Sequence, residues 1–256
     1  MKQTFLRAAP AALLCALVCI FISARARGSE THSSSQVPQG IIDSTVRIKV
    51  EQDAGTHLLA GHGSAFGVDL SSYGLLKSRY LLTAAHMVLS EDGSSLIHGS
   101  ISVELGQPLA RRWVPCKILS VTRVYDLCLL ECDEDVPVLS KLTPGKPGLD
   151  VGAPLLVVGC PLGVPPQVSA GFLRDKDPHV NDRSHKVWEA TAAFNHGNSG
   201  GPVFCAACGT VVGVAIAGVR VGGGGPQDMD PGIALFTPYY CIKHFLDVSI
   251  ERMAAR

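Results

Sequence analysis

Charged residues are scarce in this sequence, and the two signs balance. Asp, Glu, Lys and Arg make up 17% of the 256 residues, with 22 basic and 22 acidic side chains. Since there is no basic excess, the charge gives no reason to expect a nucleic-acid partner. Glycine and proline, at 27 and 16 residues, favour a turn-rich β protein over a helical bundle.

The sequence also lacks internal repeats, low-complexity runs and, after its N-terminal segment, long apolar runs. No later segment is apolar for long enough to cross a bilayer. We therefore expect no stable membrane insertion of the mature chain. The length allows one large or two small cores.

The N-terminus has the parts of a secretory signal peptide. Lys2 and Arg7 form a positive region, residues 8–22 are almost entirely apolar, and small residues precede a cleavage site after Ala26. An uncleaved anchor is the rival interpretation, but about fifteen apolar residues interrupted by Pro10 are short for a membrane span. We expect a secreted or periplasmic protein, whose mature chain carries 19 basic and 22 acidic residues.

One octapeptide carries most of the chemical information. Residues 195–202 read Asn-His-Gly-Asn-Ser-Gly-Gly-Pro. A serine within such a glycine cluster can lie on a tight turn with its hydroxyl exposed, while nearby N–H groups converge on one point. Acyl transfer needs both a nucleophile and such donors. The alternative is a plain polar turn, since Asn, Ser and Gly favour turns. Ser199 is the candidate nucleophile.

A serine hydroxyl is a weak nucleophile at neutral pH and needs a neighbouring base, most often histidine. His86 follows the β-leaning run at residues 80–83 and two small alanines, so we expect it at the end of a strand. The chain has nine histidines, and a packed or solvated side chain is the default for any of them. Its position after this run distinguishes His86.

An aspartate can fix the tautomer of that histidine by accepting its other N–H. Asp126 stands immediately before the apolar run at residues 127–130, at the expected mouth of a buried strand. Asp133 and Asp135 are alternatives, but they lie in an acidic stretch typical of a solvated turn. We therefore prefer Asp126.

With these residues in the order His86, Asp126, Ser199, the chain resembles the chymotrypsin-fold (trypsin-like) serine peptidases, and most of all their HtrA/Deg-like branch. The resemblance covers roughly Ile41 to Thr237. His196 departs from it, because the branch usually has proline there, and no chain for a PDZ domain follows the catalytic unit. The matching segments are Gly61-His62-Gly63-Ser64-Ala65-Phe66, Thr83-Ala84-Ala85-His86, Asp126-Leu127, Val157-Val158-Gly159-Cys160-Pro161-Leu162-Gly163, Thr191-Ala192-Ala193 and Gly197-Asn198-Ser199-Gly200-Gly201-Pro202.

This resemblance implies an all-β fold of two antiparallel β-barrels with the active site between them. It also implies an oxyanion hole formed by the backbone N–H groups of Gly197 and Ser199. No metal or organic cofactor is required. Polypeptides are the expected substrates, and an oligomer is left open.

The expected organisation is a signal peptide at residues 1–26, a flexible lead-in at 27–40, a first barrel at 41–140, and a second barrel at 141–256. The two barrels form one peptidase domain, and Tyr239–Met253 has the apolar spacing of a terminal helix. Ile41-Ile42 is expected to begin a strand. Expected strands are 44–50, 64–69, 79–83, 101–105, 113–121 and 127–132 in the first barrel, and 154–158, 168–174, 186–191, 202–205, 211–217 and 233–237 in the second.

By the same resemblance, the substrate side-chain pocket is lined by uncharged residues. An Arg or Lys side chain would enter it unpaired, at a cost of several kcal/mol. We expect small or medium aliphatic residues before the scissile bond. The implied lining residues are Ala193, Phe194, Ile216, Ala217, Gly218, Gly232 and Ala234.

The mature chain keeps seven cysteines, an odd number that leaves at least one thiol without an intramolecular partner. Cys128 and Cys160 lie inside apolar runs and are expected to be buried. A local disulfide between Cys205 and Cys208 is left open, since strand geometry could disfavour it. No second pair completes a zinc site, so no metal is expected.

The sequence therefore predicts a serine endopeptidase acting on unfolded or exported proteins. The alternative is a catalytically weak relative that binds apolar polypeptide segments without cutting them. The complete set of His86, Asp126 and Ser199 argues against this alternative, because a binding module needs none of the three.

Overall fold

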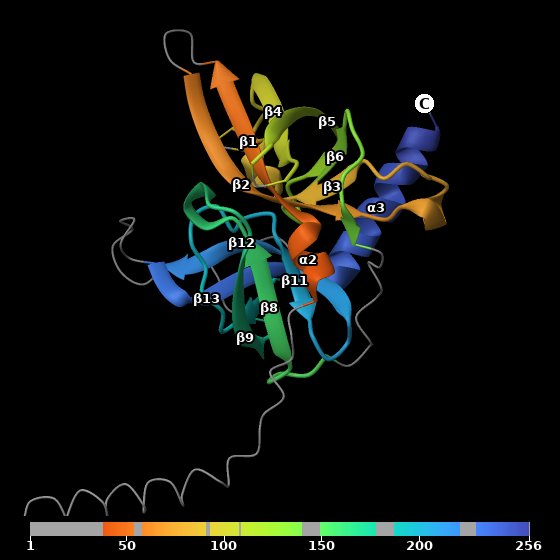
Figure 1. Cartoon of the computed structure of the whole chain (residues 1–256). Coiled ribbons are helices and arrows are strands. Elements are labelled where there is room, and N and C mark those ends of the chain that lie inside the picture. Colours follow the sequence, from red (N-terminus) through yellow and green to blue (C-terminus); the bar gives the residue numbers. More distant parts are fainter. Residues whose placement is uncertain are drawn as a thin grey trace, which may run out of the picture. The chain divides into compact units, whose positions relative to one another are not determined.

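A computed structural model describes residues 38–53, 58–90, 93–107, 109–139, 149–177, 187–220 and 229–255. The expected signal peptide, nearly all of the lead-in and the segment joining the two expected barrels lie outside these residues. Two β-barrels and one C-terminal helix make up most of the described chain (Figure 1). The predicted all-β fold is confirmed.

Six antiparallel strands form the first barrel. Their ring runs β1-β4-β5-β6-β3-β2 and closes where β2 pairs with β1, while the short β7 adds to β2 in parallel. The strands are β1 (Thr45–Asp53), β2 (Leu58–Val68), β3 (Tyr80–Thr83), β4 (Gly99–Leu105), β5 (Arg112–Thr122), β6 (Leu127–Cys132) and β7 (Val138–Leu139).

The second barrel is a closed ring in the order β10-β13-β12-β11-β8-β9. A short 3-10 turn, η3 (Pro161–Gly163), follows its first strand. The strands are β8 (Pro154–Gly159), β9 (Gln167–Asp175), β10 (Trp188–Ala190), β11 (Pro202–Cys205), β12 (Thr210–Arg220) and β13 (Met229–Pro238).

Three apolar clusters explain why these strands form. One fills the first barrel, one fills the second, and one lies where strands of both barrels meet the C-terminal helix. Strand β6 contributes to two of them, because successive side chains point to opposite faces. Leu127 and Leu129 belong to the cluster shared by the barrels, while Cys128 and Leu130 face the interior of the first. This double burial accounts for the continuous apolar run in the sequence.

The C-terminal helix α3 (Tyr239–Ala254) begins directly after Pro238, as predicted. Ile242, Phe245 and Leu246 lie at helical spacing and are buried in the shared cluster. The helix contacts β12 and β13 of its own barrel and β5 of the first barrel, and in Figure 1 it runs beside both.

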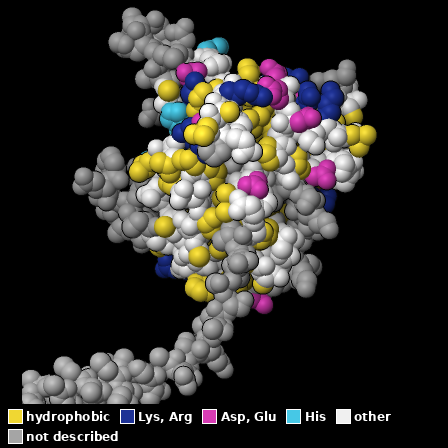
Figure 2. All heavy atoms as spheres, in the orientation of Figure 1, with side chains coloured by type: hydrophobic (Ala, Val, Ile, Leu, Met, Phe, Trp, Pro, Cys, Tyr) yellow, Lys and Arg dark blue, Asp and Glu magenta, His cyan; other side chains and the backbone are white. Residues whose placement is uncertain are grey.

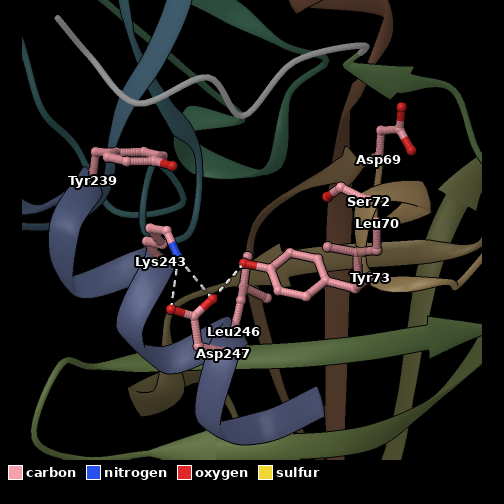
Figure 3. A pocket seen from close by; sticks show the side chains of 8 residues that line it. All are labelled: Asp69, Leu70, Ser72, Tyr73, Tyr239, Lys243, Leu246 and Asp247. Atoms are coloured by element: carbon pink, nitrogen blue, oxygen red, sulfur yellow. Dashed lines mark hydrogen bonds and ion pairs between the residues drawn. The ribbon is translucent and has the colours of Figure 1, made fainter. Parts of the chain in front are cut away.

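Polar contacts reinforce this docking. The Tyr73 hydroxyl, in the 3-10 turn η1 (Ser71–Tyr73), donates to Asp247 over 2.8 Å, and Lys243 donates to the same carboxylate (Figure 3). These side chains line a cavity of about 330 Å³ between η1 and α3. Helix α3 thus connects the end of the chain to the first barrel.

One sequence expectation is wrong. Ile41-Ile42 does not begin a strand but lies in the short helix α2 (Gln39–Asp43). Ile41 is buried in the shared cluster, and its carbonyl accepts the hydroxyls of Ser44 and Thr45. The one-turn helix buries Ile41 and provides hydrogen-bond donors for its carbonyl from nearby residues. In a strand, that carbonyl would need a donor from a partner strand.

Charged side chains gather over the first barrel on the face shown in Figure 2. Many are paired with a side chain of opposite charge, and surface pairs of this kind each contribute about 0–1 kcal/mol. No helix in the described part of the chain is both long and apolar enough to span a bilayer. The pairs in this barrel are Arg47–Glu104, Lys49–Glu51, Arg79–Asp135, Arg111–Glu104, Arg112–Glu134 and Lys117–Glu131.

Candidate active site

His86 lies in the 3-10 turn η2 (Ala85–Met87), directly after strand β3, and two hydrogen bonds attach it to Asp126. Its backbone N–H donates to Asp126 Oδ1 over 2.8 Å, and its ring Nδ1 lies 2.8 Å from Oδ2. A carboxylate only accepts hydrogen bonds, so in the neutral ring this contact assigns the proton to Nδ1 and leaves the lone pair on Nε2.

Asp126 ends the turn between β5 and β6 in a left-handed conformation, with φ of 52°. Aspartate tolerates this region better than most residues. Its backbone carbonyl accepts the N–H of Ala85 over 3.1 Å. The preceding carbonyl, of Tyr125, accepts the buried Thr237 hydroxyl of β13 over 2.7 Å. The second barrel therefore helps to hold the turn that presents Asp126.

Ser199 lies in a tight loop before β11, and two glycines in left-handed conformations shape this loop. Gly197 has φ of 97° and Gly200 has φ of 87°. A Cβ atom at Gly200 would lie 2.1 Å from the Ser64 carbonyl oxygen and 2.2 Å from Thr83 Oγ1. No larger residue fits there, which explains the glycine at position 200 of the octapeptide.

The same contacts dock the serine loop on the first barrel. The N–H of Ser64, on β2, donates to the Ser199 carbonyl over 2.8 Å. Gly200 lies against the end of β3, where Thr83 and Ala84 directly precede the turn that holds His86. The structure thus brings the serine loop and the His86–Asp126 pair to the junction of the two barrels.

The Ser199 hydroxyl lies 3.5 Å from the carbonyl oxygen of Ile216. Among the described residues it makes no hydrogen bond to His86. Catalytic hydrogen bonds are often long or poorly aligned before substrate binds. A rotation about the Cα–Cβ bond of Ser199 would redirect the hydroxyl.

The loop at η3 contacts the segment proposed as the oxyanion hole. The Leu162 N–H donates to the His196 carbonyl over 2.7 Å. In a trans peptide the C=O and the following N–H point in opposite directions. The N–H of Gly197 therefore points away from Leu162. Leu162 itself has φ of 53°, an uncommon conformation for a branched side chain.

The residues proposed for the substrate pocket fall into two groups. Ala193 and Gly232 are exposed, and Ala217 and Gly218 are half-buried on β12. Phe194, Ile216 and Ala234 are instead buried among the apolar clusters. Strand pairing puts Gly218 opposite Ala234. The uncharged lining is thus partly core in this structure.

The structure decides the expectations for four of the cysteines. Cys205 and Cys208 form a disulfide across the turn between β11 and β12, with their Cα atoms 5.2 Å apart. Cys128 and Cys160 are fully buried, and burial raises the pKa of the Cys160 thiol to about 12. In the described ranges, no cluster of three or more His, Cys, Asp or Glu side chains could hold a metal ion.

Sequence reasoning missed three residues that hold this site. Ser64 and Leu162 lie within quoted motifs, but nothing in those motifs indicates which partner each residue contacts. Thr237 has no local signal, because its hydroxyl acts on a turn 112 positions earlier in the chain.

Comparisons with known proteins identify the family and agree with the fold. A family model described as a trypsin-like peptidase domain matches residues 63–214. A probable periplasmic serine endoprotease, DegP-like, from Hahella chejuensis is 32% identical over 137 residues, which are 52% of this chain and 26% of that relative. The magnetosome formation protease MamE of Paramagnetospirillum magneticum is 30% identical over 104 residues, 40% of this chain and 14% of MamE.

A solved structure of the HtrA-type protease AlgW with a tripeptide has a TM-score of 0.64 and 20% sequence identity. The match covers 84% of this chain and 62% of that one. At this identity the likeness concerns the fold. The family model is matched over more than half of the chain, and the matched range contains His86, Asp126 and Ser199. This chain therefore belongs to the trypsin-like peptidase domain family.

Proposed function

We propose that this protein is a serine endopeptidase in which Ser199 is the nucleophile, His86 the general base and Asp126 the residue that orients His86. The observation that carries the proposal is the double attachment of His86 to Asp126 beside a docked serine loop. A solvated or merely packed histidine would need neither bond.

The proposed chemistry follows from the protonation states. With its Nδ1 proton held by Asp126, His86 takes the Ser199 hydroxyl proton on Nε2 as the oxygen attacks the substrate carbonyl carbon. The resulting imidazolium is stabilised by the carboxylate and then gives its proton to the leaving amine. In the second half, His86 takes a proton from water as the water oxygen attacks the acyl carbon, and then returns it to the Ser199 oxygen as that oxygen leaves.

Negative charge develops on the carbonyl oxygen of the substrate during each attack. The backbone N–H groups of Gly197 and Ser199 would stabilise this charge. Removal of one such preorganised donor typically lowers kcat by about 10²–10³-fold. This role is supported by the anchored His196 carbonyl, which sets the direction of the Gly197 N–H.

The proposed substrates are unfolded or exported polypeptides with Val, Ala, Ile or Leu before the scissile bond. The lining carries no charge, and burial of Phe194 and Ala234 supports a shallow pocket. A peptide library should show these residues at that position. Dominance of Arg or Lys there would overturn this pocket assignment.

We also propose export, with a signal peptide removed after Ala26. Two curated relatives named as probable periplasmic endoproteases support this proposal. N-terminal sequencing of exported protein should find Arg27 first. An N-terminus at Met1 on exported protein would contradict the proposed cleavage.

Labelling with a serine-reactive phosphonate tests the catalytic proposal. The mature chain should be labelled at Ser199 and should cleave an unfolded protein, while Ser199→Ala should lose both properties. Ser71→Ala, at an exposed serine of the first barrel, is the matched control and should keep both. Binding of unfolded protein without labelling or cleavage would favour the alternative of a catalytically weak binder.

A further inference from the structure

Ser64 is a fully buried residue of β2 whose polar groups all have partners. Its hydroxyl donates to the Gly197 carbonyl over 2.6 Å and accepts the Cys160 N–H over 2.8 Å. Its backbone N–H donates to the Ser199 carbonyl, and its own carbonyl accepts the Thr83 hydroxyl over 2.7 Å. One side chain of the first barrel therefore joins two loops of the second.

These contacts fix both peptide planes that flank Gly197. Leu162 holds the His196 carbonyl, and Ser64 holds the carbonyl of Gly197 itself. Glycine adopts many backbone conformations at little cost. The Asn198 N–H, in the same peptide unit as the Gly197 carbonyl, also donates to the Asn195 carbonyl over 3.0 Å. Together with this bond, the two external hydrogen bonds keep the Gly197 N–H in one direction.

The hydroxyl also couples the serine loop to η3. It accepts the Cys160 N–H immediately before that turn, while Leu162 within the turn reaches back to His196. The result is a closed set of contacts through Ser64, Gly197, His196, Leu162 and Cys160. Loss of the Ser64 hydroxyl would leave a buried N–H and a buried carbonyl without that partner.

We propose that Ser64 is a positioning residue for the oxyanion hole, acting through the Gly197 carbonyl to hold the Gly197 N–H toward the developing charge. This inference rests on the proposed serine endopeptidase activity. It predicts an effect on the transition state with little effect on substrate binding, because Ser64 is buried and does not touch substrate.

The first test is Ser64→Ala. A positioning role predicts that kcat falls about 10- to 100-fold, somewhat less than the loss of an oxyanion donor itself, while KM stays within about twofold. Affinity for a peptide boronate, which forms a tetrahedral adduct with the serine, should fall in parallel. Ser249→Ala is the matched control. Ser249 is a buried serine of helix α3, and its hydroxyl donates to the Ser120 hydroxyl over 2.8 Å. This variant should keep wild-type kcat.

A second variant separates positioning from packing. Ser64→Gly leaves room for one water, which can donate to the Gly197 carbonyl and accept the Cys160 N–H. If the Ser64 hydroxyl positions the loop, kcat should therefore be higher for Ser64→Gly than for Ser64→Ala. If Ser64 only fills space in the core, the order should be reversed, because glycine leaves the larger cavity and the more flexible strand.

Ser64→Cys keeps the test valid if the smaller variants do not fold. Its thiol is a weak donor in place of the hydroxyl, so kcat should fall while KM holds. Wild-type kcat in folded Ser64→Ala or in folded Ser64→Cys would overturn the inference. Absence of both peptidase activity and phosphonate labelling in the wild-type chain would instead overturn the proposed function.

Discussion

Asp126 illustrates how much a single residue can do at this site. Its carboxylate binds both the backbone N–H and the ring of His86, so it fixes the turn and the side chain together. Its backbone is in the left-handed region, with φ of 52°. Asparagine tolerates the same conformation. Replacing Asp126 by asparagine therefore changes the side-chain chemistry with little backbone strain.

We predict that Asp126→Asn lowers kcat by up to about 10⁴-fold, because the amide favours the wrong tautomer of His86. Steady-state peptidase assays measure this loss. Asp133→Asn and Asp135→Asn, at exposed carboxylates considered as alternatives, serve as controls and should leave kcat unchanged. A large loss in either control with Asp126→Asn silent would show that the orienting residue is misassigned.

Two glycines with similar backbone angles should respond very differently to alanine. Gly200 has φ of 87° and a crowded Cβ position, whereas Gly209 has φ of 67° and open space around it. Gly209→Ala should cost about 1–2 kcal/mol of unfolding free energy from left-handed strain alone and keep activity. Gly200→Ala adds overlap with Ser64 and Thr83, so it should cost more and abolish activity. Denaturant titration compares the two, and equal costs would contradict the crowding argument.

At the scale of elements, helix α3 couples the end of the second barrel to the first. The hydrogen bond from Lys243 is the main cause that lowers the pKa of the Asp247 carboxyl, and the Tyr73 hydroxyl lowers it further (Figure 3). A lowered pKa means that the folded state favours the carboxylate. Its stabilisation is therefore present above the ordinary pKa of 3.8 and is lost as pH falls through the lowered value.

Asp247→Asn should reduce the unfolding free energy at pH 7 by about 1 kcal/mol or less, because the pair with Lys243 is largely solvated. The difference from wild type should shrink as the pH falls below 3.8. Denaturant titrations across this range, combined with Tyr73→Phe in a double-mutant cycle, measure it. Asp150→Asn, at an exposed carboxylate, is the control. If the stability difference between Asp247→Asn and wild type grew as the pH fell, the pKa of Asp247 would not be lowered by folding.

At the scale of the whole molecule, the shared apolar cluster joins both barrels and α3 in one core. It contains Phe66 and Leu82 of the first barrel, Val158 and Leu235 of the second, and Leu246 of the helix. Neither barrel can expose its part of this cluster without cost to the other. The described chain should therefore unfold in one cooperative step.

The two tryptophans of the chain allow a direct test. Trp113 lies on β5 of the first barrel and Trp188 on β10 of the second. In single-tryptophan variants, made by Trp113→Phe or Trp188→Phe, the fluorescence transitions in denaturant should coincide. Leu246→Ala should lower the unfolding free energy by about 2–5 kcal/mol and shift both transitions equally. A shift confined to Trp188 would show that the barrels unfold independently.

Sequence patterns predicted the strands best where burial is continuous. The expected bounds of 127–132 and 202–205 match β6 and β11, because residues 127–130 and 202–205 are buried on both faces and form continuous apolar runs. Ile41-Ile42 was misassigned for a related reason. Two apolar residues indicate burial but not conformation, and here local hydrogen bonds from Ser44 and Thr45 favour a helical turn.

The sequence by itself determined the family, the two-barrel fold and the three candidate catalytic residues. Each of these residues lies in a short motif, and the motifs together indicate the family and its fold. Only the tertiary structure decided how those motifs are held. Ser64 reaches Gly197 across 133 positions, and Thr237 reaches Tyr125 across 112. Each of these bonds needs a buried hydroxyl on one strand and a carbonyl on a distant turn. Chain folding creates that proximity, and no local pattern records it.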